Sequence, residues 1–455
     1  MKKRKLRALC VVLCCALALT SCGASSPTSE GLPPPKEQNN ASNAQNELRL
    51  AYSKEDGFNP YRSTSTLVLQ CAQLLFDSLV VIRDDFELDY HLARLVSTSG
   101  TTAVITLGSG SFADGTPITA ADVAASIEAA RASALYGGRF AQVVSVKPSD
   151  SIVTVELSQP DSLFAYLLDI PILKASETAL PSPTASGRYS VHESETGASL
   201  VANSTFADQT ELDSITLVPI TAHDALVAGL NMGTVSLYAS EQDEDLAGNN
   251  ICNTAYYNLN NLVFIGVNAQ NGVLAQPAVR TALSAALSRR QLVDKVYYSR
   301  AYVATNLANS RYPFLSGEHT IAADANPAAV ALQLEALGYV RSSETGFYRD
   351  ASGRELSFEL LCYSGNTFKR YLASLVQEQL AECGVRITLA EESDFNLYRE
   401  KIASGQFSLY IGEVKLYNNI NLDPFFSQNG NAHYGIVPSE ALLAAYGAAR
   451  ADRNL

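Results

Sequence analysis

Tryptophan is absent from the 455-residue sequence, and histidine occurs only five times. The histidines are scattered: no two of them stand four residues apart, and none belongs to an HExxH motif. Zinc hydrolases typically hold their metal with two histidines on one helix face, so such a site has little support. We therefore predict neither a metal site nor a cofactor. The five positions are His91, His192, His223, His319 and His433.

Motifs for nucleotide binding and for nucleophilic catalysis are also missing. The sequence contains no GxSxG, no GxxxxGK[ST] and no GxGxxG that opens a helix, so a nucleophile elbow, a P-loop and a Rossmann fingerprint have no candidate. Adjacent acidic residues, Asp84-Asp85 and Glu391-Glu392, are typical of solvated turns and strand edges. A hydrolase whose carboxylates are distant in sequence stays open as an alternative. Binding is therefore the default class of function.

Cysteines are few after residue 22, and none forms a CxxC pair. Their wide spacing gives a metal or redox cluster little support, and we expect buried free thiols. A single disulfide between Cys362 and Cys383 remains an alternative in an oxidising compartment. The positions concerned are Cys71, Cys252, Cys362 and Cys383.

The first residues have the pattern of a signal peptide. Five cationic residues precede Ala8, and a twelve-residue apolar run follows to Leu19, which is too short to span a bilayer. Leu19-Thr20-Ser21-Cys22 resembles a bacterial lipobox, in which the cysteine receives a diacylglyceryl group and becomes the new N-terminus. We expect residues 1–21 to be removed and Cys22 to anchor the protein to the membrane. A plain secretory signal cleaved near Ser21 is the alternative.

Acidic residues outnumber basic ones in the mature chain. Loss of residues 1–21 removes five positive charges and lowers the formal net charge from −13 to −18. Such a surface disfavours nucleic acid and anionic lipid, so we expect no nucleic-acid partner. No later segment approaches eighteen consecutive apolar residues, and anchoring would therefore rest on the lipid alone.

Beyond a tether at 22–46 that is rich in Ser, Asn, Pro and Gly, strands and helices are interspersed. The mixture predicts an α/β or α+β architecture. Alternation of apolar residues predicts strands at 47–52, 103–107, 151–158, 214–220, 262–268, 356–363, 385–390 and 407–414. Apolar periodicity predicts helices at 275–298, where Val279, Leu283 and Leu287 recur, and at 326–339 and 368–384, which both end near a glycine.

Residues 111–130, SFADGTPITAADVAASIEAA, combine a turn with a helix start. Asp114-Gly115 is turn material, and Thr119 with Asp122 has the spacing of a capping box. Val123, Ile127 and Ala130 then form one apolar stripe that we expect to face a core. Locally these residues predict structure and not catalysis.

The segment FADGTPITAADV, residues 112–123, also reproduces a family signature nearly residue for residue. It resembles F-x-D-G-T-P-[IL]-T-A-x-D-V of the family 5 solute-binding proteins of ABC importers, the oligopeptide-, dipeptide- and nickel-binding group. Further blocks resemble that family in the same order over most of the mature chain: RLAYSKEDGFNPY at 49–61, LLFDSLVVI at 74–82, SGRYSV at 186–191, ALVAGLNMGTVSLY at 225–238, and the inter-lobe crossover at 262–296.

The resemblance implies a two-lobed, type II periplasmic-binding-protein clamshell of α/β class with an extra domain inserted in the first lobe. On that basis we expect a first lobe at 47–62 and 180–260, an inserted domain at 63–179 and a second lobe at 261–435. Family members normally continue with a long helix and a return to the first lobe. Residues 436–455 are therefore interpreted as the start of a truncated return segment.

The resemblance also implies a function. We expect a monomeric, lipid-anchored binding subunit at the extracytoplasmic face of the bacterial cell membrane, periplasmic where an outer membrane is present. It would capture a solute, by family default a small peptide, and deliver it to a permease and ATPase without catalysis. A sensor, or a carrier of a nickel chelate or sugar, and an extracytoplasmic hydrolase are the alternatives.

The family's ligand anchor is altered here. Peptide binders hold the ligand's α-amine with an aspartate just before a tyrosine, but Leu416 precedes Tyr417 in this sequence. A buried ammonium needs a carboxylate partner, for which Glu413 and Asp423 are the candidates, although Asp423 equally suits a turn. The candidate ligand-binding residues are Tyr417, Asn418, Asp423, Glu413, Tyr363, Ser364, Asn366 and Tyr257, with Tyr256 as a further cleft aromatic. Their alternative roles are helix capping for Ser364 and Asn366, and core or surface packing for the tyrosines.

Overall fold

The computed structural model describes residues 47–195, 197–239, 253–270, 272–309, 311–315 and 321–452. All described helices and strands lie in one compact unit that comprises residues 45–252 and 256–455. The predicted signal peptide, Cys22, the tether and Cys252 lie outside the described residues.

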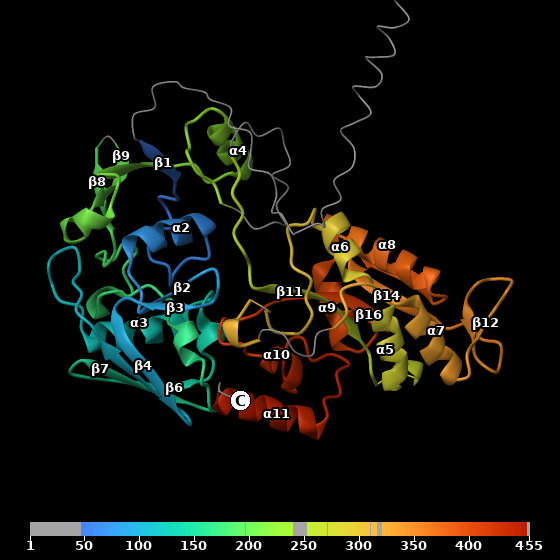
Figure 1. Cartoon of the computed structure of the whole chain (residues 1–455). Helices are drawn as coiled ribbons and strands as arrows, with labels where there is room; N and C mark the ends of the chain where they lie inside the picture. Colours follow the sequence, from blue (N-terminus) through green and yellow to red (C-terminus); the bar gives the residue numbers. More distant parts are fainter. Residues whose placement is uncertain are drawn as a thin grey trace, which may run out of the picture. The chain divides into compact units, whose positions relative to one another are not determined.

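The first sheet pairs the start of the folded chain with residues far along the sequence. Its order is β1-β10-β9-β8, with β1 parallel to β10 and the other pairs antiparallel. Alternation buries Ile215 and Leu217 of β10. The elements are β1 (Leu48–Ala51), β8 (Tyr189–Ser194), β9 (Gly197–Ala202) and β10 (Ser214–Val218), with helices α2 (Thr66–Leu75) and α4 (His223–Asn231), as drawn in Figure 1.

The second sheet is antiparallel throughout, in the order β4-β5-β7-β6. Helix α3 (Ala120–Ala132) packs on it with the predicted stripe: Val123, Ile127 and Ala130 are fully buried. The predicted capping box is also confirmed, since the backbone N–H of Thr119 donates to Asp122 Oδ2 at 2.8 Å. The strands are β4 (Ala93–Ser99), β5 (Thr102–Leu107), β6 (Val143–Ser149) and β7 (Ile152–Leu157), and a small pair β2 (Val80–Ile82) and β3 (Leu88–Tyr90) lies apart from this sheet.

One hydrophobic cluster joins the first two sheets. It contains Leu200 and Leu217 of the first sheet together with Ile105 and Val155 of the second, and α3 contributes Ile127. These apolar side chains form a continuous core beneath both sheets.

The third sheet has the order β11-β16-β14-β15. β14 is parallel to both β15 and β16, whereas β11 is antiparallel to β16. Helices α5 (Pro277–Ala285), α6 (Arg289–Val296), α7 and α8 supply one hydrophobic cluster against this sheet, and α9 supplies another. The elements are β11 (Asn261–Val267), β14 (Ser357–Tyr363), β15 (Arg386–Glu392), β16 (Leu409–Lys415), α7 (Pro327–Ala336), α8 (Thr367–Glu382) and α9 (Phe395–Ala403), with a hairpin of β12 (Val340–Arg341) and β13 (Tyr348–Arg349).

The prediction of one helix over 275–298 is wrong. The segment forms α5 (Pro277–Ala285) and α6 (Arg289–Val296), separated at Ser288. The Ser288 hydroxyl accepts from the N–H of Gln291 and so caps α6, while its own N–H donates to Gln379 Oε1 of α8 at 3.0 Å. The helix therefore ends because a distant residue holds the backbone at the break.

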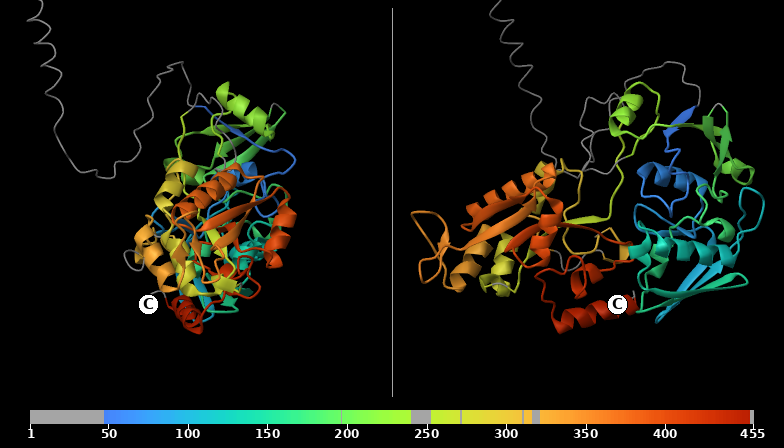
Figure 2. Two further views of the ribbon diagram at one scale, coloured as in Figure 1. Left: turned by 90° about the vertical axis from the view of Figure 1, so that its right-hand side faces the viewer. Right: turned by 180° about the vertical axis from the view of Figure 1, so that it is seen from behind.

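The last helices connect the third-sheet segment to residues near the second sheet. These are α10 (Asp423–Phe426) and α11 (Glu440–Ala451). The carbonyl of Arg450 accepts from the N–H of Ser162 at 2.8 Å, and the Arg450 side chain pairs with Asp161. Figure 2 shows the end of α11 next to the strands of the second sheet, in agreement with these contacts.

Each predicted strand is found within two residues of its expected bounds. Gly338 and Gly384, which follow α7 and α8, have the positive φ of helix C-caps, as predicted. Cys71, Cys362 and Cys383 are buried free thiols, so the alternative disulfide is not formed. Over the described ranges, no helix combines the length and apolar character needed to cross a bilayer. Short 3₁₀-helices occur at Gly137–Phe140, Phe164–Leu167, Ala175–Glu177, Ser204–Gln209, Gly272–Ala275 and Pro313–Leu315.

Candidate functional site

A hollow of about 1120 Å³ opens at the carboxyl ends of the parallel strands β1 and β10. In open α/β sheets, ligands bind outside the carboxyl ends of the strands. The volume lies slightly above the usual range of about 300–1,000 Å³ for small-ligand sites. The lining residues come from the loops that follow these two strands, from the starts of α2 and α4, and from the segment after α4: Tyr52, Ser53, Lys54, Glu55, Asp56, Thr64, Ser65, Thr66, Leu67, Pro219, Thr221, His223, Asp224, Leu226 and Tyr238.

Aromatic and charged groups share the lining of this hollow. His223 Nδ1 lies 3.3 Å from Tyr238 Oη, and Tyr52 stacks on Phe58 with ring centroids 5.9 Å apart. Neither α2 nor α4 has a side-chain cap, and residues of their first turns line the hollow. The lining thus offers hydrogen-bond donors, an imidazole and aromatic surface to one ligand.

The carboxyl edge of the third sheet brings together several of the predicted site residues. Tyr363 ends β14, and Ser364 donates its backbone N–H to the carbonyl of Glu392 at the end of β15. Asn366 caps α8 by accepting from the N–H of Lys369 at 2.9 Å. The Tyr363 ring packs edge-on against Phe395, with centroids 5.2 Å apart. Tyr363 and Asn366 therefore have packing and capping roles at this edge.

Glu413 of β16 is part of the same edge and already has two partners. Lys369 Nζ lies 2.7 Å from Glu413 Oε2, and Asn261 Nδ2 donates to Glu413 Oε1 at 2.9 Å. The side chains of Lys369 and Glu413 are 18% and 22% exposed, so the pair is partly accessible. The negative charge of Glu413 is therefore balanced by the positive charge of Lys369 in this structure.

Tyr417 and Asn418 follow β16 and contact distant segments. Asn418 accepts from Tyr312 Oη through its carbonyl at 2.6 Å and from Asn260 Nδ2 through its side chain at 3.3 Å. Tyr417 packs against the core that joins the first two sheets, and burial raises the pKa of its phenol. Burial also lowers the pKa of nearby Arg139 to about 10.

Asp423 is held by three side chains. Its Oδ2 accepts from Gln142 and Gln159, both at 2.9 Å, and its Oδ1 accepts from Tyr446 Oη at 3.1 Å. The residue also starts helix α10. These partners give Asp423 a structural role that links segments far apart in the sequence.

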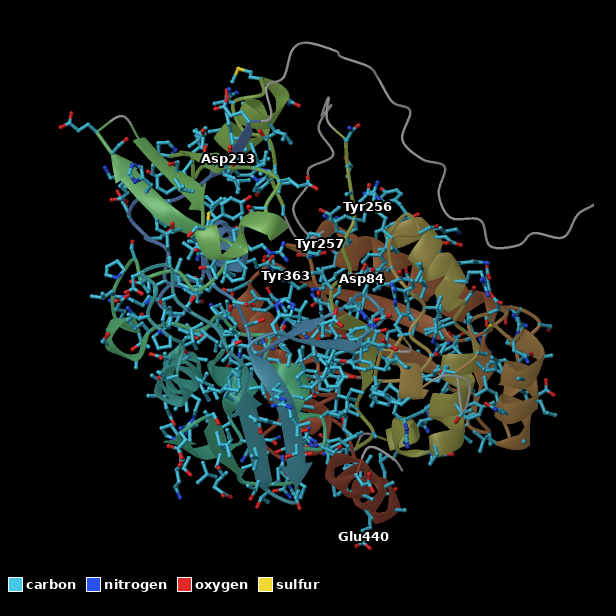
Figure 3. All side chains as sticks on the ribbon, turned by 60° about the vertical axis from the view of Figure 1, so that its left-hand side comes forward. Asp84, Asp213, Tyr256, Tyr257, Tyr363 and Glu440 are labelled. Carbon is cyan, nitrogen blue, oxygen red and sulfur yellow. The ribbon has the colours of Figure 1, made fainter. Side chains whose placement is uncertain are left out.

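Tyr256 and Tyr257 lie on the segment that leads into β11 and are exposed by 58% and 56% (Figure 3). The guanidinium of Arg300 lies 4.6 Å from the ring centroid of Tyr256. In the part of the chain that the structure describes, no three His, Cys, Asp or Glu side chains gather as a metal-ligand set.

Comparison with known proteins identifies the family. The model of the bacterial extracellular solute-binding proteins, family 5 Middle, matches residues 88–433, which is more than half of the chain. The chain belongs to family 5 of the bacterial extracellular solute-binding proteins. The resemblance seen in the signature at 112–123 is thereby confirmed.

Individual relatives of this family 5 protein are distant. It is 27% identical over 230 residues to the oligopeptide-binding protein AppA of Bacillus subtilis, an alignment that covers 48% of this chain and 42% of AppA. The chain spans less than half the length of the curated relatives it matches, 30% to 42%.

Solved structures show that the fold of this family 5 protein is the type II periplasmic-binding-protein fold. The murein tripeptide binding protein MppA in its unliganded open form matches with a TM-score of 0.72 at 18% identity, over 90% of this chain and 86% of MppA. A nickel ABC transporter protein from Bacillus halodurans matches with a TM-score of 0.69 at 17% identity, over 90% and 88% of the two chains. The predicted fold class is confirmed.

The hollow in this family 5 protein was not predicted from the sequence. The hollow forms because residues 48–51 pair with residues 215–218, which places the loops that follow these two strands side by side. No local pattern in either loop indicates that pairing.

Proposed function

We propose that the protein is the solute-binding subunit of an ABC importer and that its ligand is a small peptide. The observation that carries this proposal is the family match over residues 88–433. Two relatives whose names refer to oligopeptide and murein tripeptide binding support a peptide as the ligand class. The extracytoplasmic side of the membrane is the compartment expected of the family.

The ligand is proposed to bind between a first lobe at 47–62 and 180–260, which carries an inserted domain at 63–179, and a second lobe at 261–435. The first lobe, together with Thr64–Leu67 at the start of the inserted domain, would contribute the hollow beside β1 and β10. The second lobe would contribute the carboxyl edge of the third sheet, with Tyr363, Ser364 and Glu413. Binding would favour the closed arrangement of the lobes, because the ligand contacts both lobes only in that arrangement.

The mature chain is proposed to begin at a lipid-modified Cys22. The lipobox-like Leu19-Thr20-Ser21-Cys22 and the cationic, apolar segment before it support this. Mass spectrometry of the protein purified from membranes tests the anchor. A diacylglyceryl adduct on an N-terminal Cys22 is expected, and an unmodified chain that begins elsewhere contradicts it.

Transport would then require a membrane permease and its ATPase, with no reaction catalysed by this monomeric subunit. The test is thermal stabilisation of the mature chain by a panel of di- to pentapeptides, sugars and nickel–histidine, followed by chromatography of the ligand. Saturable stabilisation by peptides, with the ligand recovered unchanged, supports the proposal. Stabilisation only by nickel–histidine or a sugar rejects the peptide, and product formation rejects a purely binding role.

A further inference from the structure

The Lys369–Glu413 pair lies at the carboxyl edge of the third sheet, which the proposed function assigns to the ligand. Glu413 lies near the carboxyl end of β16, and Lys369 lies in the first turn of α8. One Glu413 oxygen is 2.7 Å from Lys369 Nζ, and the other accepts from Asn261 Nδ2. Both oxygens of this carboxylate therefore have a partner from the protein itself.

A second cation is disfavoured at this position. An ammonium brought to Glu413 would either displace Lys369 or stand a few ångströms from it, where like charges repel in a partly desolvated site. Asp423 is the other carboxylate considered for this role, and three donors already surround it. Neither acidic side chain is thus available to a ligand amine.

Asn261, which donates to Glu413, keeps one acceptor atom for a neutral donor. Asn261 Oδ1 is buried and has no hydrogen-bond partner among the described residues, while its Nδ2 is committed to Glu413. A buried oxygen without a partner carries a desolvation cost that an amide N–H or hydroxyl removes. The edge is accordingly suited to a neutral donor.

We propose that Lys369 determines charge specificity: by neutralising Glu413, it makes the edge of the third sheet select ligands that present a neutral N–H instead of a free α-ammonium. This inference rests on the proposed peptide-binding function. Its ligand class is a peptide whose N-terminus is blocked, or one bound through internal amides.

The experiment compares two peptides of one sequence, with a free and with an acetylated N-terminus. Binding is measured by calorimetry to the mature wild-type chain and to Lys369→Gln, which keeps a hydrogen-bonding side chain and releases the Glu413 charge. The wild type is expected to bind the acetylated peptide at least as tightly. In Lys369→Gln, the ratio of the affinity for the free-amine peptide to the affinity for the acetylated peptide is expected to rise by at least about tenfold. A charge-assisted hydrogen bond to Glu413 contributes an effect of this size.

Three further variants serve as controls, with thermal melting as the check on folding. Lys369→Arg keeps the cation and should keep the wild-type ratio. Lys401→Gln breaks the neighbouring Lys401–Glu392 pair, also 2.7 Å long, and should leave the ratio unchanged. Glu413→Gln leaves the Lys369 cation unpaired and should shift the ratio further toward the acetylated peptide, which keeps the inference testable if Lys369→Gln does not fold.

The outcomes separate this inference from the function on which it rests. A wild type that prefers the free amine, with that preference abolished in Glu413→Gln, overturns the role of Lys369. An unshifted ratio in folded Lys369→Gln overturns it as well. Failure of both peptides and of the wider panel to bind contradicts the proposed peptide-binding function instead.

Discussion

Tyr410 of β16 lies directly opposite Gly266 of β11, and its ring covers the glycine. The two residues are register partners, and a Cβ on Gly266 would overlap the ring of Tyr410. Two residues away, the arrangement is reversed: Phe264 of β11 covers Gly412 of β16. Cross-strand glycine–aromatic pairs of this kind fix the register of two strands. They explain why glycines occur inside the strands of the third sheet.

Replacement of Gly266 by alanine is expected to destabilise the protein. The added methyl group must displace the Tyr410 ring, which is 3% exposed, and overpacking of this kind costs about 1–3 kcal/mol. Urea unfolding followed by circular dichroism measures the effect. Gly447→Ala is the control, because a Cβ there meets no atom within 4 Å and alanine favours helix α11. Equal effects of the two substitutions would contradict the account.

The buried pair of Arg450 and Asp161 connects α11 to the segment before the second 3₁₀-helix. Their side chains are 8% and 2% exposed, and Asn419 also donates to Asp161 at 2.6 Å. Arg450→Met leaves the Asp161 charge without its cation, which we expect to lower the unfolding free energy by about 3 kcal/mol. The double variant Arg450→Met/Asp161→Asn should recover part of this loss.

An exposed ion pair provides the comparison for Arg450. Arg354 is 81% exposed and lies 2.9 Å from Asp350. Arg354→Met should leave the unfolding midpoint nearly unchanged, because solvent screens such pairs. A similar loss of stability in Arg450→Met and Arg354→Met would show that burial does not strengthen the Arg450–Asp161 pair.

Asp114 of the family signature should make stability depend on acidic pH. Hydrogen bonds from Lys174 and Thr116 lower the pKa of its carboxyl to about 2. Because the folded pKa lies below the unfolded value of about 3.9, the stabilisation is present above the unfolded pKa and is lost as pH falls toward the folded pKa. The melting-temperature difference between wild type and Asp114→Asn should therefore narrow from pH 5 to pH 2. A difference that widens over this range contradicts the assignment.

The described cysteines should resist modification in the native protein. Burial raises the pKa of Cys71 and of Cys362 to about 11, and the pKa of Cys383 is raised as well. Since the thiolate is the reactive form, iodoacetamide at pH 8 should label these residues only after unfolding. Peptide mass mapping measures the labelling. Prompt native labelling, or a Cys362–Cys383 disulfide without reductant, would contradict the structure.

Features with local causes were predictable from the sequence. The helix start at Thr119 depends on a residue three positions away, and the apolar stripe of α3 depends on the helical repeat. The strand alternation around Ile215 and Leu217 likewise needs only neighbouring residues. The family signature adds the fold class, because it identifies the whole architecture from twelve residues.

Features with distant causes were not predictable in this way. The break at Ser288 depends on Gln379, which is 91 positions away. The partners of Asp423 and Glu413 come from other segments, so spacing does not show that both carboxylates are occupied. The hollow beside β1 exists only because β1 pairs with β10. Ligand chemistry depends on such contacts, whereas the fold is evident from the sequence.

Calorimetric titration of the mature chain with a peptide panel is the measurement that tests the central claim most directly, with mass spectrometry of the recovered ligand. The account predicts one-to-one, saturable binding of at least one peptide, recovered intact. Absence of binding by every peptide, or recovery of a cleaved peptide, would contradict the assignment of this family 5 protein as a peptide-binding subunit.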